Sequence, residues 1–256
     1  MSENVTFHDL EGQSVFITGG GSGIGAALTE GFLKQGANVA FVQRSDASEF
    51  ATEMGEKYGN KPLFIKCDVT DVPSLRFAIK EASKAHGNIT VMVNNAAIDQ
   101  RHEMEGYTVE EWDFAMDVNL RPHYFTAQAV AKGMKEAGGG SIINFSSISY
   151  MMGAGGYTSY MTSKAAIVGM TRALARELGP DNIRVNALSP GWVLTQRQLD
   201  KWATPEDLAS HLEKQCLKEH LVPDDIVDAT LFLASKASRM MTSQAMVVDG
   251  GVAMTG

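Results

Sequence analysis

The sequence Thr18-Gly19-Gly20-Gly21-Ser22-Gly23-Ile24-Gly25 lies between a predicted strand and a predicted helix. The strand is the β-branched run SVFIT at 14–18, and the helical period covers 26–35. Glycines at such a junction permit a tight turn and bring backbone N–H groups close to a bound pyrophosphate, and the helix N-terminus adds positive potential. A glycine-rich turn alone is a weak sign, but together with the strand and the helix it predicts a dinucleotide-binding βα unit.

Strands and helices alternate along the rest of the chain. β-Branched runs predict strands at 38–42, 62–68, 90–95, 141–147, 183–188 and 245–249. Helical periods occupy 48–58, 74–86, 109–137 and 157–178, and two more begin after Thr204 and at Pro223, whereas 189–204 is expected to be irregular. This alternation predicts an α/β fold, a Rossmann-like, doubly wound and mainly parallel sheet of about seven strands with helices on both faces.

Composition excludes several classes of protein. The chain has 256 residues, and 30 Asp and Glu outweigh 22 Lys and Arg. Because no linker interrupts the pattern, we expect a single domain over 1–256. The acidic balance disfavours nucleic acid as a partner. Cys67 and Cys216 are far apart and lack neighbours at ligand spacing, so neither a metal site nor a disulfide is expected. With no signal peptide and no membrane-spanning run, we expect a cytoplasmic protein.

Several motifs together resemble the short-chain dehydrogenase/reductase family. In chain order they are Thr18-Gly19-x-x-x-Gly23-Ile24-Gly25, Asn94-Asn95-Ala96-Ala97, Asn119, Ser147, Tyr160-x-x-x-Lys164, Pro190-Gly191 with Thr195, and Asp249-Gly250-Gly251. They cover nearly the whole chain, and Ala97 stands where the family usually has glycine.

The resemblance implies an NAD(P) cofactor and four catalytic residues, Asn119, Ser147, Tyr160 and Lys164. It also implies cofactor contacts from Gly19, Ser22, Gly23, Ile24, Gly25, Gln43, Arg44, Asp68, Val69, Asn95, Ala96, Tyr160, Lys164, Pro190, Val193 and Thr195.

The chemistry of these residue types agrees with the roles that the resemblance implies. Tyr160 and Lys164 are one helical turn apart, and a neighbouring cation is expected to lower the pKa of the phenol. Ser147 follows a predicted strand at its carboxyl end, where open α/β sheets bind ligands, and Ser146 is the local alternative. For Asn119 two interpretations remain, a proton relay to Lys164 or a polar residue that satisfies backbone groups.

The end of the second predicted strand bears on the choice of cofactor. Gln43 stands where relatives selective for NAD usually have Asp, so nothing there repels a 2′-phosphate, and Arg44 could pair with one. Ser22, by contrast, occupies a place where many NADP-dependent relatives carry a basic residue. We therefore expect use of both cofactors or a preference for NADP. Asp68 either meets the adenine or caps its strand.

Segments 98–104, 148–156 and 191–202 are expected to line the substrate pocket because they follow strand ends. Their polar side chains, including Asp99 and Ser149, together with Trp192, suit a polyol better than an acyl chain or a steroid. Further pieces resemble bacterial aldose 1-dehydrogenases acting on D-xylose, L-arabinose or D-galactose: Arg101-His102, 118–121, 170–181, Thr195-x-Arg197-Gln198, Trp202-x-Thr204-Pro205-Glu206 and 215–218. This implies hydride transfer from C1 of a monosaccharide to NAD(P)⁺, giving an aldonolactone.

Other functions remain open. The same catalytic residues serve reductases of 3-oxoacyl thioesters and other carbonyls, and a non-catalytic NAD(P)-binding regulator could share the fold. The resemblance also implies a homo-oligomer, a dimer or tetramer, assembled through the helices that carry Asn119 and Tyr160.

Overall fold

The computed structural model describes residues 5–153 and 155–254. Seven parallel strands form one sheet in the order β3-β2-β1-β4-β5-β6-β7. Their bounds are β1 Ser14–Thr18, β2 Asn38–Gln43, β3 Leu63–Lys66, β4 Val91–Asn94, β5 Gly140–Phe145, β6 Ile183–Pro190 and β7 Ala245–Val248. The order reverses direction between β1 and β4, and open α/β sheets bind their ligands at such a switch point.

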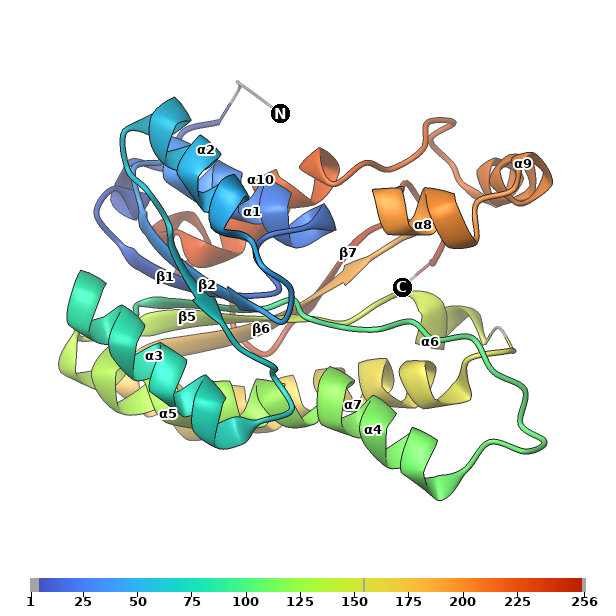
Figure 1. Cartoon of the computed structure of the whole chain (residues 1–256), viewed down its shortest axis with the longest axis horizontal. Helices are drawn as coiled ribbons and strands as arrows, with labels where there is room; N and C mark the ends of the chain where they lie inside the picture. Colours follow the sequence, from blue (N-terminus) through green and yellow to red (C-terminus); the bar gives the residue numbers. More distant parts are fainter. Residues whose placement is uncertain (1–4, 154, 255–256) are drawn as a thin grey trace.

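Helices cover both faces of the sheet (Figure 1). One layer contains α1 Gly23–Lys34, α2 Ser48–Tyr58 and α10 Asp224–Ala234. The opposite layer contains α3 Val72–His86, α4 Val109–Asn119, α5 Arg121–Glu136 and α7 Thr158–Leu178. The expected Rossmann-like, doubly wound architecture is thus confirmed. The described residues also contain three short 3₁₀ turns, His8–Leu10, Gly179–Asp181 and Lys236–Ser238.

Alternate side chains of β1 pack in two separate hydrophobic cores, one on each face of the sheet. Val15 and Ile17 belong to the apolar cluster beneath α1 and α10, whereas Phe16 belongs to the cluster beneath α3 and α5. All three side chains are fully buried. A strand buried on both faces reads as a continuous apolar run, which is why SVFIT shows no polar alternation.

Side-chain caps fix where several helices begin. Asp71 accepts a hydrogen bond from Ser74 N at 3.0 Å before α3, and Thr108 forms a reciprocal capping box with Glu111 before α4. Thr204 accepts from Asp207 N at 3.1 Å, which confirms the helix expected after it, α9 Pro205–Lys214. Each cap satisfies a backbone donor that the first turn leaves unpaired.

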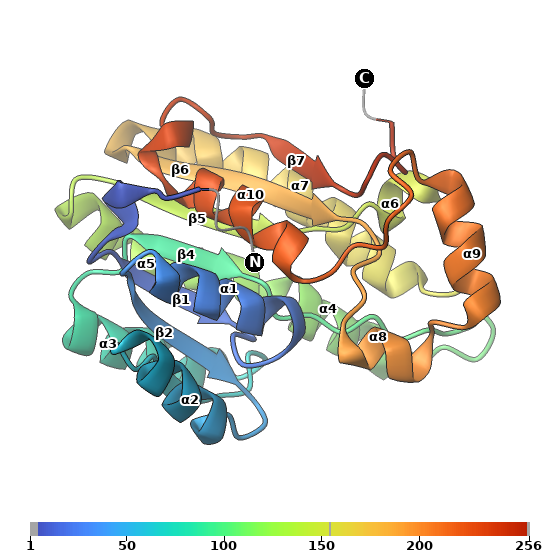
Figure 2. The ribbon, with the colours of Figure 1, turned by 90° about the horizontal axis from the view of Figure 1, so that it is seen from above.

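Two short helices were not predicted. The segment expected to be irregular, 189–204, contains α8 Gln196–Lys201, and α6 Ser149–Met152 follows β5. Both lie beyond the carboxyl ends of the strands, and α8 and α9 stand beside one another at one end of the molecule (Figure 2). Neither α6 nor α8 is long enough to produce a helical period that sequence reading detects.

A chain of buried polar groups joins the sheet to the α5 and α7 layer. Asn94 Nδ2 donates to Asn144 Oδ1 at 2.9 Å, and Thr126 Oγ1 donates to Asn94 Oδ1 at 2.7 Å. Asn144 Nδ2 in turn donates to Thr171 Oγ1 of α7 at 3.0 Å. Because a buried polar group left unpaired is costly, these bonds fix the position of α7 on the sheet.

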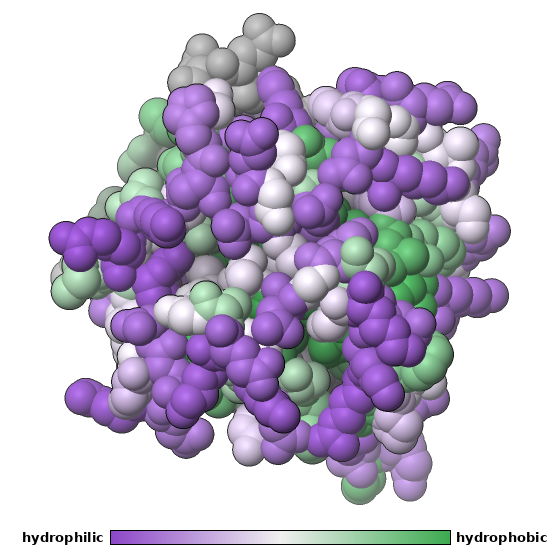
Figure 3. Space-filling view, turned by 90° about the vertical axis from the view of Figure 1, so that its left-hand side faces the viewer, coloured by the Kyte–Doolittle hydropathy of each residue, from purple (hydrophilic) through white to green (hydrophobic). Residues whose placement is uncertain are grey.

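The end of the molecule remote from α8 and α9 is mostly covered by hydrophilic residues, with one apolar area toward an edge of the view (Figure 3). No helix among the described residues is both long and apolar enough to cross a bilayer.

Candidate active site

A cleft of about 790 Å³ opens beyond the carboxyl ends of β1, β4, β5 and β6. Each of these strands contributes the residue or turn that follows it: Gly19 after β1, Asn95 after β4, Ser147 after β5 and Gly191 after β6. The cleft therefore lies where the fold predicts a ligand.

The turn after β1 cannot carry side chains at its key positions. A Cβ atom on Gly25 would collide with the carbonyl oxygen of Gly19, and one on Gly23 would approach Thr195 Cγ2 to 3.2 Å across the cleft. Gly19 and Gly23 also have positive φ angles of 70° and 52°. Asn95 holds the turn in place, because its Nδ2 donates to the carbonyl oxygens of Thr18 and Gly19 at 3.0 and 3.3 Å.

The N-terminus of α1 faces this cleft. α1 begins at Gly23, and the side chain of Ser22, the residue before it, makes no capping hydrogen bond. The Ser22 side chain therefore leaves the first backbone N–H groups of α1 uncapped. Backbone donors beside a bare glycine surface suit an anionic pyrophosphate. The residues present thus fit a dinucleotide. Of the expected cofactor residues, Gly19, Ser22, Gly23, Ile24, Gly25, Asn95, Ala96, Tyr160, Lys164, Pro190, Val193 and Thr195 line the cleft.

Four expected cofactor residues do not line it. Gln43 Oε1 accepts from Gly21 N at 3.0 Å, and Arg44 is exposed. Asp68 Oδ1 accepts from Thr70 N and Oγ1 at 3.0 and 2.8 Å, as expected of a strand-end cap. Val69 is buried in the apolar cluster beneath α3.

Lys164 is a buried cation beside Tyr160. Its side chain is 1% exposed, and Nζ donates to Phe145 O at 2.8 Å and lies 5.4 Å from the centroid of the Tyr160 ring. Burial lowers the pKa of Lys164 to about 7, although the negative charge of Asp99 opposes this shift.

The pKa of Tyr160 differs from the sequence-based expectation. Burial raises it above its ordinary value of 10, and the charges of Asp99 and Tyr157 raise it further, whereas a hydrogen bond with Ser147 lowers it. The expected lowering of this pKa by Lys164 is therefore not found in the protein alone, where burial of the phenol has the largest effect.

The structure separates the two candidate serines. Ser146 is buried and donates to Lys164 O at 2.7 Å, so its hydroxyl supports α7. Ser147 lines the cleft, accepts from Ser149 N at 3.2 Å and shares a hydrogen bond with Tyr160. Ser147 is thus the serine able to meet a substrate oxygen.

Asn119 is fully buried at the end of α4. Its Oδ1 accepts from Ile98 N at 2.8 Å, and its Nδ2 donates to Ile98 O at 3.0 Å. It lines a small cavity behind Tyr160 rather than the main cleft. The side chain therefore satisfies backbone groups, and the proton relay stays a prediction.

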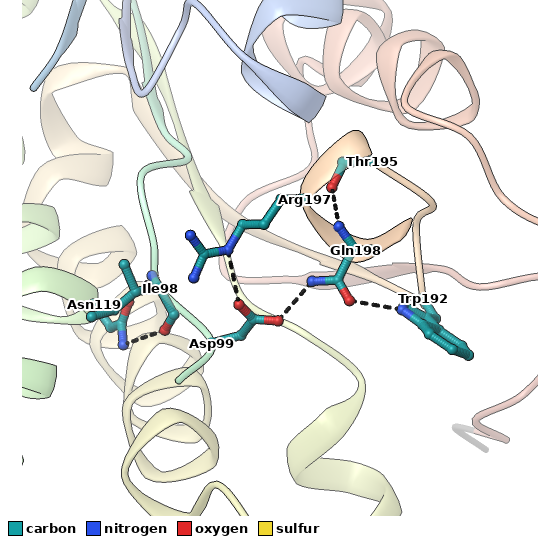
Figure 4. A network of polar contacts seen from close by, with 7 residues as sticks. All are labelled: Ile98, Asp99, Asn119, Trp192, Thr195, Arg197 and Gln198. Carbon is teal, nitrogen blue, oxygen red and sulfur yellow. Dashed lines mark hydrogen bonds and ion pairs between the residues drawn. The ribbon is translucent and has the colours of Figure 1, made fainter. Parts of the chain in front are cut away.

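The three expected substrate residues, Asp99, Ser149 and Trp192, all line the cleft. Asp99 Oδ2 accepts from Gln198 Nε2 at 2.7 Å, and Gln198 Oε1 accepts from Trp192 Nε1 at 2.9 Å (Figure 4). Arg197 Nε lies 3.5 Å from Asp99 Oδ1. The hydroxyl of Ser149 is buried and has no hydrogen-bond partner among the residues that the structure describes. Arg197 and Gln198 lie in the segment 191–202 that was expected to line the pocket, but their contacts with Asp99 could not be predicted, because Asp99 lies 99 residues from Gln198 in the chain.

Aromatic rings enclose the outer part of the cleft. The guanidinium carbon of Arg101 lies 4.7 Å from the centroid of Tyr157 and 5.1 Å from that of Trp202. Tyr157 precedes α7, and Trp202 ends α8, so one arginine joins two walls. Within residues 5–153 and 155–254, no three His, Cys, Asp or Glu side chains gather in a way that could hold a metal ion.

Comparisons with known proteins agree with this geometry. A family model described as "Enoyl-(Acyl carrier protein) reductase" matches residues 19–253. The chain is 50% identical over 248 residues to a protein named probable galactose dehydrogenase from Rhizobium meliloti (strain 1021), covering 96% of this chain and 97% of that one. It is 45% identical over 247 residues to D-xylose 1-dehydrogenase from Caulobacter vibrioides (strain NA1000 / CB15N), covering 96% and 97%.

The crystal structure of a 3-oxoacyl-[acyl-carrier protein] reductase from Brucella melitensis ATCC 23457 superposes with a TM-score of 0.91 at 30% identity, covering 100% of this chain and 98% of that one. The match extends from the glycine turn to the last strand and includes the cleft. The chain therefore belongs to the short-chain dehydrogenase/reductase family of oxidoreductases.

Proposed function

We propose that the protein oxidises the anomeric carbon of an aldose sugar with NAD(P)⁺ and releases an aldonolactone. The observation that carries this proposal is a single cleft in which Ser147, Tyr160 and Lys164 face a wall of Asp99 and Trp192. The two sugar dehydrogenases at 45% and 50% identity support the same substrate class.

Residues of the chain would bind the hydroxyl group of the substrate and accept its proton. Ser147 holds the C1 hydroxyl oxygen, and Tyr160 as phenolate removes its proton. Lys164, whose ammonium lies beside the Tyr160 ring, would stabilise the phenolate and bind the nicotinamide ribose. An oxidised nicotinamide, when bound, would accept the hydride from C1. The Asn119 side chain, bound to the Ile98 backbone, is the expected end of the proton path.

A sugar requires both polar and apolar contacts. Each hydroxyl needs a donor or acceptor, and the C–H face of the ring packs on an aromatic surface. The Asp99 carboxylate and the Trp192 indole, which both line the cleft, supply these contacts. An acyl chain or a steroid would offer this polar wall few hydrogen-bond partners.

Initial rates of NADH and NADPH formation with D-galactose, L-arabinose, L-fucose, D-xylose and D-glucose test the proposal. We expect a clear rate with one or two of these sugars and a blank rate from Tyr160→Phe. No turnover of any sugar by a protein that still binds the cofactor would reject aldose oxidation.

We also propose a preference for NADP⁺. The Gln43 amide is held by Gly21 and Ser45 and carries no charge that repels a 2′-phosphate, and the exposed Arg44 lies beside it. Fluorescence titration with NADPH and NADH tests this without turnover, since Arg44→Ala should weaken NADPH binding and leave NADH binding unchanged. Equal effects of Arg44→Ala on the affinities for NADPH and NADH would contradict a preference for NADP⁺ based on Arg44.

The second candidate function is reduction of a 3-oxoacyl thioester. The TM-score of 0.91 to a 3-oxoacyl-[acyl-carrier protein] reductase favours it. Oxidation of NADPH by an acetoacetyl thioester, at a rate exceeding that with any sugar, would establish this alternative. A dimeric or tetrameric state and a cytoplasmic location stay predictions.

A further inference from the structure

One side-chain amide joins two walls of the cleft. Gln198 lies in the first turn of α8, Asp99 follows β4, and Trp192 follows β6. The Gln198 amide bonds to both of the others, at 2.7 Å to Asp99 Oδ2 and at 2.9 Å to Trp192 Nε1 (Figure 4). No other side chain in that view contacts both the carboxylate and the indole.

The chemistry of the two partners determines which way the amide points. A carboxylate only accepts hydrogen bonds, so Gln198 must direct its NH₂ group toward Asp99. An indole N–H only donates, so the amide oxygen must face Trp192. Neither contact survives if the amide is rotated by 180°, because the NH₂ group would then face the indole N–H and the oxygen would face the carboxylate. At this position asparagine would be one methylene too short.

Both partners retain capacity for a ligand. Among the described residues, the partner of the second oxygen of Asp99, Oδ1, is Arg197 Nε at 3.5 Å, which is longer than an ordinary hydrogen bond. Trp192 is fixed by the amide at its N–H and by His211, whose ring meets it edge-on at 5.3 Å and 84°. Burial lowers the pKa of His211, so this neighbour is uncharged at neutral pH.

We propose that Gln198 is a positioning residue that sets sugar specificity, by holding the Asp99 carboxylate and the Trp192 indole at a fixed separation for one hydroxylated ring. Asp99 Oδ1 accepts a ring hydroxyl while the indole meets a C–H face. The epimers accepted are those whose hydroxyl reaches the carboxylate when the ring lies against the indole. This inference rests on the proposed aldose oxidation.

Three substitutions separate the parts of the bridge. Gln198→Met keeps the length of the side chain and removes both hydrogen bonds. Gln198→Glu retains an acceptor for the indole and places a second carboxylate against Asp99. Trp192→Phe removes the indole N–H and keeps an aromatic face. Gln244→Glu is the matched control, because Gln244 is exposed and precedes β7 at the opposite end of the strands.

We expect Gln198→Glu and Gln198→Met to raise the KM for the preferred sugar about tenfold or more, since a charge-assisted bond is lost. The kcat should change less, and the ratio of kcat/KM between D-galactose and D-glucose or D-xylose should move toward one. Trp192→Phe should cause a smaller rise in KM, and the control none. Affinity for NADPH, measured by fluorescence, should stay at the wild-type value.

Two outcomes would overturn the inference. One is an unchanged KM and sugar ratio in Gln198→Met. The other is an equal loss for every sugar together with weaker NADPH binding, which would mean that Gln198 only supports α8.

The indole N–H resonance of Trp192, identified by its absence in Trp192→Phe, checks the bridge without turnover. It should shift in Gln198→Met and on addition of the preferred sugar. If the wild-type protein oxidises no aldose, the proposed function itself has failed. If the wild-type protein does oxidise an aldose but the resonance shifts neither in Gln198→Met nor on addition of the sugar, only the role proposed for Gln198 is wrong.

Discussion

At the scale of single residues, burial shifts the pKa values of Tyr160 and Lys164, the proposed catalytic pair. The pKa of Lys164 is lowered to about 7, and that of Tyr160 is raised. In both cases the loss of water around the charged form is the largest cause, so the surroundings of the two side chains matter more than their spacing along the helix.

Loss of the phenol hydroxyl tests the base directly. Tyr160→Phe should lower kcat by about 10²–10⁴-fold because a positioned general base contributes that much. Tyr150→Phe is the control, because Tyr150 lies in α6 and is not part of the cleft lining. We expect this variant to oxidise the sugar at the wild-type rate. Steady-state rates of both variants measure this loss. Their affinities for NADPH, measured by titration, should equal that of the wild-type protein. Substantial turnover in Tyr160→Phe would assign the base elsewhere.

The charge of Asp99 should be visible in the pH profile. Its carboxylate raises the pKa of Tyr160, so Asp99→Asn removes a negative charge and lowers that pKa. The rising limb of kcat/KM for sugar oxidation should therefore move to lower pH, by up to about 1 unit. Arg197→Ala leaves the carboxylate less compensated and should move the limb to higher pH. Shifts of the same sign in both variants would contradict this electrostatic account.

At the scale of elements, the junction of β1 and α1 depends on the absence of side chains. Gly25→Ala places a methyl group against the Gly19 carbonyl and should cost about 1–3 kcal/mol of stability while abolishing cofactor binding. Gly169→Ala is the counterpart, because Gly169 lies in α7 with open space around its Cα and alanine is the better helix former there. Thermal unfolding should rank Gly169→Ala above wild type and Gly25→Ala below it. A stable Gly25→Ala that binds NADPH normally would show that the turn tolerates a shift.

The elements also mark how far the sequence could be interpreted. The strands and long helices were predictable because their apolar periods are long and their caps, such as Thr204, are local. The α8 helix was not, since six residues give no detectable period. The motifs led to Ser147, Tyr160 and Lys164, which the fold brings together in one cleft, whereas their catalytic roles stay predictions. The pKa of Tyr160 and the role proposed for Gln198 were not, because they depend on burial and on partners distant in the chain.

At the scale of the whole molecule, the cleft draws its lining from both halves of the chain, from Gly19 to Val252. A ligand bound there stabilises the native state as a unit. With NADP⁺ at about 100 times its Kd, the gain is about 2.7 kcal/mol, or about 5–10 °C in Tm for a chain of this size. Differential scanning fluorimetry should show this shift in the wild-type protein and none in Gly25→Ala. An unchanged Tm in the wild-type protein at saturating nucleotide would contradict a cofactor site built from the two halves.

The distance along the chain between the two walls has a consequence for biosynthesis. Residue 19 leaves the ribosome long before residue 252, and at about 5–20 residues per second the interval is roughly 12–47 s. For about three quarters of that time the glycine turn exists without the wall formed by 190–198, and for nearly all of it without the last strand. Nucleotide cannot assist the nascent polypeptide, so early folding depends on β1, β2 and β3 and on the helices between them, and a prematurely terminated product would have no ligand to protect it from proteases.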